Sequence, residues 1–191
     1  MSTVAKLDAG RLRFLATGLA GSLLVNLSAQ FISVNAADIQ GGVFASADEA
    51  SWLSTVYTMA GFAGIATSVV FIKAFGIGRY LVVSSLVFAT TALACATAPE
   101  LSVMIALRAV QGFVAGGFGP AAFVAVFMAS GPLLPLMLAV FAGVLLIPGT
   151  LGPIVSALIE SSFGWQALFL VQAAIGAMLA LGAYAWVPHP K

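Results

Sequence analysis

The chain has very little charge, one cysteine and one histidine, and these shortages exclude several classes of protein. Only 7% of its 191 residues are charged and the net charge is +1, so no basic surface is available for nucleic acid. The single cysteine, Cys95, cannot form a disulfide within the chain, and we expect it to be a small buried residue. The single histidine, His189, leaves no metal-ligand spacing and no histidine-activated nucleophile in the apolar part. We therefore expect no metal, no cofactor and no enzyme active site.

Apolar residues, by contrast, make up 62% of the chain, and its mean hydropathy is +1.14. These values are typical of an integral membrane protein. A bilayer core about 30 Å thick requires about 20 apolar residues in a helix. Runs of this length, with short connections between them, span residues 14–37, 52–75, 80–98, 101–128, 133–161 and 165–187. The sequence thus predicts an all-α membrane protein with six transmembrane helices in one bundle, preceded by a segment at 1–13 and followed by a tail at 188–191.

The distribution of charge predicts which end of this bundle faces the cytoplasm, because Lys and Arg accumulate on the cytoplasmic side of short loops. With six spans, one end carries the basic residues Lys6, Arg11, Arg13, Lys73, Arg79 and Lys191. The other end carries most of the acidic residues, namely Asp38, Asp48, Glu49, Glu100 and Glu160, and only Asp8 breaks the separation. We therefore expect both termini in the cytoplasm and the helices in a plasma membrane, which in a bacterium is the inner membrane.

Arg108 lies inside the apolar run 101–128, where a charge costs several kcal/mol and almost always faces a bundle interior or a water-filled path. Gln111 follows one helical turn later, so the guanidinium and the amide could hold a polar ligand or a water together. Alternatively, Arg108 bonds only to backbone carbonyls of a neighbouring helix. For a substrate or proton pathway, the predicted lining is Arg108, Gln111, Asn26, Gln30 and Asn35.

Small residues and prolines mark two further segments. Gly112 and Gly116 have the GxxxG spacing that lets a neighbouring backbone approach closely. In the middle of the fifth run, the chain reads Pro148-Gly149-Thr150-Leu151-Gly152-Pro153, a combination that kinks or bends a helix. The sequence leaves open whether this is a hinge that gates a pathway or a tight packing seam.

The segment Leu107-Arg108-Ala109-Val110-Gln111-Gly112 is similar to a fourth-helix motif of the major facilitator superfamily, in its multidrug efflux branch of drug/proton antiporters. In that motif the arginine is implicated in proton coupling. Gly152-Pro153 resembles the core of the antiporter motif in the fifth helix, with Ser156 and Ala157 where a glycine pair is usual. The resemblance extends from about Leu24 to Val187. It implies one major-facilitator-type bundle of two three-helix inverted repeats, of which a whole transporter has two.

Two departures from this family pattern concern charge. The loop between the second and third helices normally forms a charged latch, but here Lys73 stands where the acid is expected, and Gly76 and Arg79 fit. The stretch from Asn26 to Gln30 has no acid, and no Asp or Glu lies near the middle of any expected helix. Because an arginine stays protonated, a proton step would have to use Glu160 or a residue outside this chain.

Two hypotheses on function follow. In the first, the chain is half of a multidrug efflux antiporter that exports amphipathic small molecules, and it works with a second six-helix bundle or a second copy of itself. In the second, it is a non-transporting accessory or truncated bundle derived from such a transporter. The retained fourth-helix motif favours the first hypothesis, whereas the altered latch and the missing acids favour the second.

Overall fold

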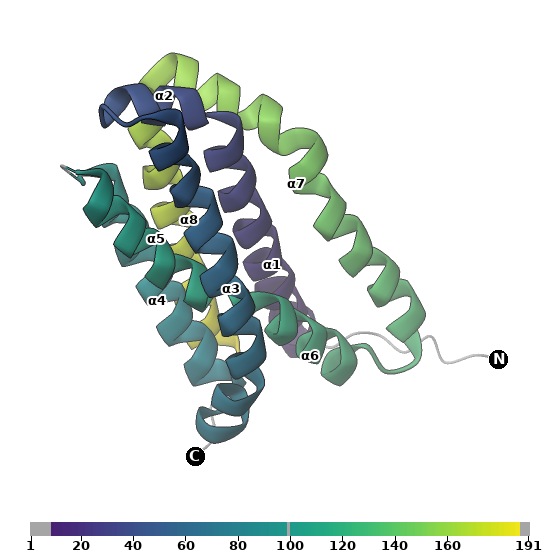
Figure 1. Cartoon of the computed structure of the whole chain (residues 1–191). Coiled ribbons are helices and arrows are strands. Elements are labelled where there is room, and N and C mark those ends of the chain that lie inside the picture. The colour runs from purple at the N-terminus through teal and green to yellow at the C-terminus, as the bar shows by residue number, and fades with distance from the viewer. Residues whose placement is uncertain (1–8, 99, 188–191) are drawn as a thin grey trace.

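The structure is a computed structural model that describes residues 9–98 and 100–187, and this part of the chain is almost entirely helical, without strands (Figure 1). Its elements are α1 (Ala9–Val34), α2 (Ala36–Gly42), α3 (Ala47–Phe75), α4 (Ile77–Ala96), α5 (Leu101–Gly116), α6 (Phe118–Ser130), the 3₁₀ turn η1 (Gly131–Leu133), α7 (Leu134–Phe163) and α8 (Trp165–Trp186). The predicted tail at 188–191 and the first eight residues, with Lys6, Asp8, His189 and Lys191, lie outside the described residues.

The start of α3 shows how local sequence sets a helix boundary. α3 begins at Ala47 rather than at the expected Trp52. The Ser46 side chain accepts a hydrogen bond from the Glu49 backbone N–H at 3.3 Å, and the Glu49 carboxylate accepts one from the Ser46 backbone N–H at 2.9 Å. This capping box satisfies two otherwise unpaired donors, and it explains why the helix begins before the apolar run.

The predicted continuous helix over 101–128 is wrong, because the chain breaks at Gly117 between α5 and α6. Gly117 is at the break, and Gly116 and Gly119 lie close to it. Pro120 lacks the amide donor that a continuous helix needs. A side chain at Gly117 would meet the Tyr80 hydroxyl group of α4, so the absence of a side chain there leaves room for Tyr80. With 16 and 13 residues, α5 and α6 are each shorter than the about 20 residues of a full crossing.

Within the described residues, five stretches are long and apolar enough to cross a membrane: Ala9–Val34, Ala47–Phe75, Ile77–Ala96, Leu101–Phe163 and Trp165–Trp186. The fourth of these has 63 residues, and it combines α5, α6 and α7. It reverses direction at η1, where Gly131 has a φ of +49°, so that α7 returns along the bundle from the end at which α6 stops (Figure 1).

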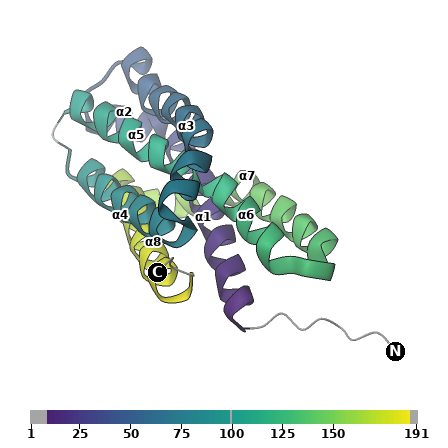
Figure 2. The same cartoon turned by 90° about the horizontal axis from the view of Figure 1, so that it is seen from below.

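The helices pack mainly in pairs. Figure 2 shows α3 beside α5, α4 beside α8, and α6 and α7 together on one side of α1. The backbones of α3 and α5 are in contact, since a Cβ at Gly112 would collide with the Tyr57 backbone and one at Gly116 with the Gly61 backbone. The GxxxG spacing of α5 therefore lies at a helix–helix seam, as small residues do in membrane bundles.

Two groups of buried side chains fill the bundle. The larger one surrounds Phe88 and Phe118, whose rings meet edge to face at 6.3 Å. A smaller one contains Ile32, Leu53 and Cys95, and it lies toward the end of the bundle where α2 and the start of α5 are found. Cys95 is fully buried, which confirms the expectation of a small core residue.

Candidate functional site

A buried polar cluster is centred on Arg108 of α5, whose side chain has no exposed surface. Its Nε donates a hydrogen bond to the Leu53 carbonyl of α3 at 3.4 Å. Its Nη1 donates to Ser28 Oγ of α1 at 3.2 Å and to Gln111 Oε1 of its own helix at 2.6 Å. The backbone-only alternative for Arg108 is therefore wrong, because two of its three hydrogen bonds are to side chains.

The ring of Tyr57 covers one face of the guanidinium, with 3.8 Å between Arg108 Cζ and the ring centroid. The Tyr57 hydroxyl donates a hydrogen bond to the Val25 carbonyl of α1 at 3.3 Å, and this bond orients the ring. Tyr57 reaches this position because α3 and α5 are in backbone contact at Gly112. A desolvated cation gains about 2 kcal/mol or more from such an aromatic face.

The polar contacts extend through Ser28 to α8. Ser28 Oγ donates a hydrogen bond to Gln172 Oε1 at 2.6 Å, and both residues are buried. Hydrogen bonds between side chains therefore connect α1, α5 and α8. One hydrogen bond to a backbone carbonyl connects α5 to α3. In a membrane interior, polar groups that bond across helices hold the helices in register.

Three nitrogen donors of the cluster are buried and have no hydrogen-bond acceptor among the residues that the structure describes: Arg108 Nη2, Gln111 Nε2 and Gln172 Nε2. None of the contacts of Arg108 within residues 9–98 and 100–187 is to a carboxylate. The cluster thus has a surplus of donors and an uncompensated positive charge. Chemically, it suits a group that only accepts hydrogen bonds, such as a carbonyl, an anionic oxygen or the oxygen of a water.

The other predicted pathway residues lie on α1 and at its end, and their amides make different contacts. Asn26 Nδ2 donates to the Ser22 carbonyl and Asn35 Nδ2 to the Phe31 carbonyl, each at 2.8 Å and each one turn back in the chain. The aliphatic part of Gln30 faces Gly152 of α7. Of the five predicted residues, Arg108 and Gln111 are the two that a hydrogen bond joins.

The proline and glycine segment of α7 lies within one continuous helix that contains both Pro148 and Pro153. Gly152 is buried, and a Cβ there would crowd the side chain of Gln30 on α1. A Cβ at Gly149, by contrast, would meet open space. Gly152 is therefore the position at which α7 packs closely on α1.

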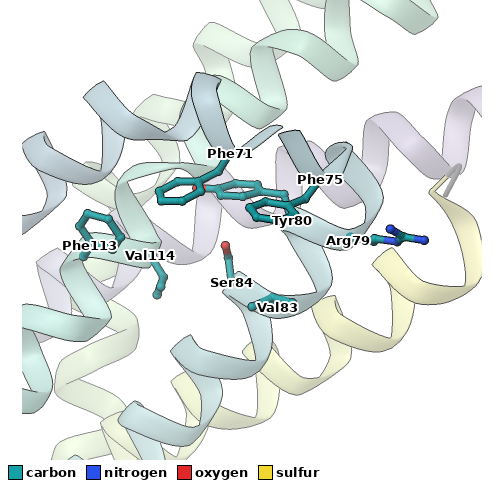
Figure 3. A pocket seen from close by; sticks show the side chains of 8 residues that line it. All are labelled: Phe71, Phe75, Arg79, Tyr80, Val83, Ser84, Phe113 and Val114. Atoms are coloured by element: carbon teal, nitrogen blue, oxygen red, sulfur yellow. The ribbon is translucent and has the colours of Figure 1, made fainter. Parts of the chain in front are cut away.

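The residues of the predicted loop motif lie where α3 turns into α4. Gly76 has a φ of +82°, a conformation that favours glycine, and it separates the two helices. Lys73 is in the last turn of α3 and Arg79 in the first turn of α4, and both are exposed. Arg79 points away from a group of aromatic rings on the same two helices (Figure 3).

Ser28, Tyr57 and Gln172 belong to the cluster, but the sequence did not identify them as pathway residues. Gln172 had a usable signal, since it is a polar residue in the middle of the apolar run 165–187. Ser28 and Tyr57 are too common in membrane helices to be recognised without their contacts. Among the described residues, no three His, Cys, Asp or Glu side chains are close enough to hold a metal ion.

Comparison with known proteins shows the family to which the chain belongs. The sequence pattern of the Major Facilitator Superfamily matches residues 11–191. The colistin resistance protein EmrB of Acinetobacter baumannii is 26% identical over 165 residues, which are 86% of this chain and 32% of that protein. The multidrug resistance protein B homolog of Mycobacterium tuberculosis is 28% identical over 172 residues, or 90% of this chain and 32% of that protein.

A third relative, the methylenomycin A resistance protein of Streptomyces coelicolor, is 37% identical over 95 residues, which are 48% of this chain and 20% of that protein. The chain thus spans about a third of the length of the first two relatives. The match to the family pattern nevertheless covers nearly all of α1, every element from α2 to α8 and the whole Arg108 cluster. With its helical bundle and its membrane-spanning stretches, the chain belongs to the Major Facilitator Superfamily, a family of membrane transporters.

Proposed function

We propose that this chain forms one six-helix bundle of an efflux transporter that exports amphipathic small molecules. The family match supports transport, and the names of the curated relatives, which are resistance proteins, support export. A pathway that opens alternately to the two sides of the membrane needs an opposing wall. A second six-helix bundle or a second copy of this chain supplies that wall.

The observation that carries this proposal is the buried Arg108 with its unused donors. A charge in a membrane interior costs several kcal/mol, and here no acid compensates that cost among the contacts of Arg108 in the described residues. A bundle that served only as a scaffold would be more stable with an apolar residue there. The unused donors of Arg108, Gln111 and Gln172 give the cluster the capacity to bind the polar part of a substrate or the water that accompanies it.

We further propose that the six helices are two inverted repeats, α1–α3–α4 and α5/α6–α7–α8. In this arrangement α1 corresponds to α5/α6, α3 to α7, and α4 to α8. Exchanging the corresponding helices turns the α3–α5 pair into the α7–α1 pair. The same exchange turns α4–α5 into α8–α1 and leaves α4–α8 unchanged. All of these pairs are in contact, so the packing supports the symmetry that the superfamily implies.

The proposed orientation places the ends of α1 and α8 that carry the chain termini in the cytoplasm of a bacterial cell. Within the described residues, Arg11, Arg13, Lys73 and Arg79 lie at this end, which is the lower end in Figure 1. Asp48, Glu100 and Glu160 lie at helix ends on the opposite side. The positive-inside rule supports this direction, and the relatives named above are bacterial proteins.

Among the described residues, the Arg108 cluster contains no carboxylate that could carry the proton of the proposed antiporter. Arg108 stays protonated, so it can tune or bind a charged group but cannot carry the proton itself. Glu160, near the end of α7, or an acid of the second bundle would carry it.

Export can be tested in bacteria that lack their main drug pumps. The chain is expressed alone and together with a second six-helix bundle from the same genome, and the accumulation of a fluorescent amphipathic dye is measured. We expect the combination to lower accumulation, and Gln172→Leu to abolish the effect. Gln166→Leu is a matched control, because Gln166 is on the same helix but exposed.

The result that would overturn the proposal is unchanged accumulation in every combination, with all proteins present in the membrane. It would identify the chain as a non-transporting accessory bundle. If both glutamine variants retained export, transport would stand, but the Arg108 cluster would not be its binding site.

A further inference from the structure

Two apolar grooves meet at the exposed face of α4, and Arg79 and Val83 line both of them. Neither residue belongs to the buried Arg108 cluster. The position is at the basic end of the bundle, where the chain turns from α3 into α4. Two grooves that diverge from one cationic side chain have the shape of a receptor for a molecule with two tails and one head.

The first groove has a volume of about 410 Å³ and lies between α3, α4 and α5 (Figure 3). The stacked rings of Phe71 and Phe75, 6.3 Å apart, form one wall. Phe113 and Val114 of α5 form the far end. Its lining is almost wholly apolar, and Arg79 stands at its rim with the side chain directed outward.

The second groove begins at Arg79 on the other side of α4 and follows the seam between α4 and α8. A hollow of about 440 Å³ is lined by Arg79, Val82, Val83 and Tyr184. A further hollow of about 370 Å³ shares Val82 and Tyr184 with it and continues to Leu86 and Ala177. The two hollows form one apolar path along the helices, away from the basic end and toward the middle of the bundle.

The charge at this end is of one sign in the described part of the chain. Arg11, Arg13, Lys73 and Arg79 lie there, whereas the described acids lie in α2, near the start of α3 or α5, or near the end of α7. The cytoplasmic leaflet of a membrane carries anionic lipids, which are attracted to basic residues at its surface. A guanidinium also matches the geometry of a phosphate, and its five donors let it add such a contact to those it already makes.

We propose that α4 carries a binding site for an anionic two-chain phospholipid, with one acyl chain in each groove and the phosphate at Arg79. The α3–α5 groove takes the first chain and the α4–α8 seam takes the second. The lipid thus occupies both sides of α4, between α4 and the α3–α5 pair on one side and between α4 and α8 on the other. The site requires only that the bundle is embedded in a membrane, so it does not depend on transport.

Lipid binding to the purified full chain can be measured by native mass spectrometry in detergent. The probes are phosphatidylglycerol and phosphatidylcholine with identical acyl chains. We expect one phosphatidylglycerol to bind in preference, and Arg79→Gln to weaken its binding about fivefold while weakening that of the zwitterionic phosphatidylcholine much less. Lys73→Gln is the matched control, because Lys73 is an exposed cation at the same end that lines neither groove.

An equal loss in Lys73→Gln and Arg79→Gln would overturn the site, since it would show diffuse attraction to a basic surface. Equal binding of both lipids to the unaltered chain would overturn the preference for an anionic headgroup, since both lipids carry a phosphate and only phosphatidylglycerol has a net negative charge. A second variant tests the grooves. Val83 is 59% exposed, so Val83→Trp fills the space beside it without entering the core, and we expect it to reduce the binding of both lipids.

Leu93→Trp is the control for this variant, because Leu93 is an exposed residue on the same helix, outside the grooves. Unchanged lipid binding in Val83→Trp would overturn the groove assignment.

The alternative occupant of the grooves is another protein chain. Val83→Cys tests this alternative in membranes, since Cys95 is buried. Disulfide or cross-linker products with a second copy or another chain would overturn the proposal, whereas labelling by a photoactivatable phosphatidylglycerol supports it.

Discussion

The guanidinium carbon of Arg108 lies 3.8 Å from the ring centroid of Tyr57, so the only buried charged side chain in the described residues rests on an aromatic face. The contact crosses from α5 to α3, and the two helices approach closely because Gly112 has no side chain to hold them apart. The buried charge and the glycine seam are therefore parts of one arrangement. A change in either is expected to affect the other.

Replacing Tyr57 separates the contribution of its ring from that of its hydroxyl. Tyr57→Phe keeps the aromatic face and loses the hydrogen bond to the Val25 carbonyl, so we expect the free energy of unfolding to fall by about 1 kcal/mol. Tyr57→Leu also removes the cation–π contact, and we expect a total loss of about 3 kcal/mol. The measurement is unfolding of the purified protein in one detergent. Equal losses in the two variants would show that the ring does not stabilise Arg108.

A double substitution tests whether Arg108 is retained at the expense of stability. Arg108→Met with Gln111→Leu removes the charge, and it removes the amide that would otherwise lose its partner. Replacing a buried charged group and its partner by apolar residues of similar size is often stabilising, so we expect the free energy of unfolding to rise by about 1–3 kcal/mol.

The same variant is expected to be inactive in the dye accumulation assay described above. A gain in stability with a loss of export would assign the cluster to function. If the double variant instead unfolds at a lower temperature than the unaltered protein, the cluster is mainly a structural connection between helices.

The sequence was sufficient to predict the membrane class, most helices and the shared position of Arg108 and Gln111, because hydrophobic length and helical spacing are local properties. It did not predict the break in the 101–128 run, because the apolar length of the run is also that of one long helix. The contact between Gly117 and Tyr80 at the break was not predicted either. That contact comes from a different helix, so no local pattern contains it. The start of α3 was also placed too late, although Ser46 and Glu49 have the capping-box spacing that marks it.

The cluster partners were less accessible to sequence reasoning, because they come from four helices. Ser28 joins Arg108 to Gln172 across a sequence separation of 80 residues on one side and 144 on the other. Helix positions alone do not say which face of α8 meets α1. By contrast, the amides of Asn26 and Asn35 bond to their own helical turns, an outcome that is always available to such side chains.

The glycine seam between α3 and α5 predicts a sharp difference between two similar substitutions. A methyl group at Gly112 would collide with the Tyr57 backbone, which cannot move aside without separating the helices. We expect Gly112→Ala to lower the free energy of unfolding by about 1–3 kcal/mol, as overpacking does. Gly119→Ala is the matched control, since a Cβ at Gly119 has no atom within 4 Å. Similar unfolding of the two variants would contradict direct backbone contact.

Gly76 offers a test of the turn on which the proposed lipid site depends. Its φ of +82° and ψ of 149° lie in a region that other residues adopt only with strain. We expect Gly76→Ala to lower the free energy of unfolding by about 1–3 kcal/mol, and to weaken phosphatidylglycerol binding because Arg79 and Phe75 no longer hold their relative positions. Gly143→Ala is the control, because that glycine has neither a positive φ nor a close neighbour. Unchanged stability in Gly76→Ala, measured beside this control, would mean that the turn relaxes to a conformation open to all residues.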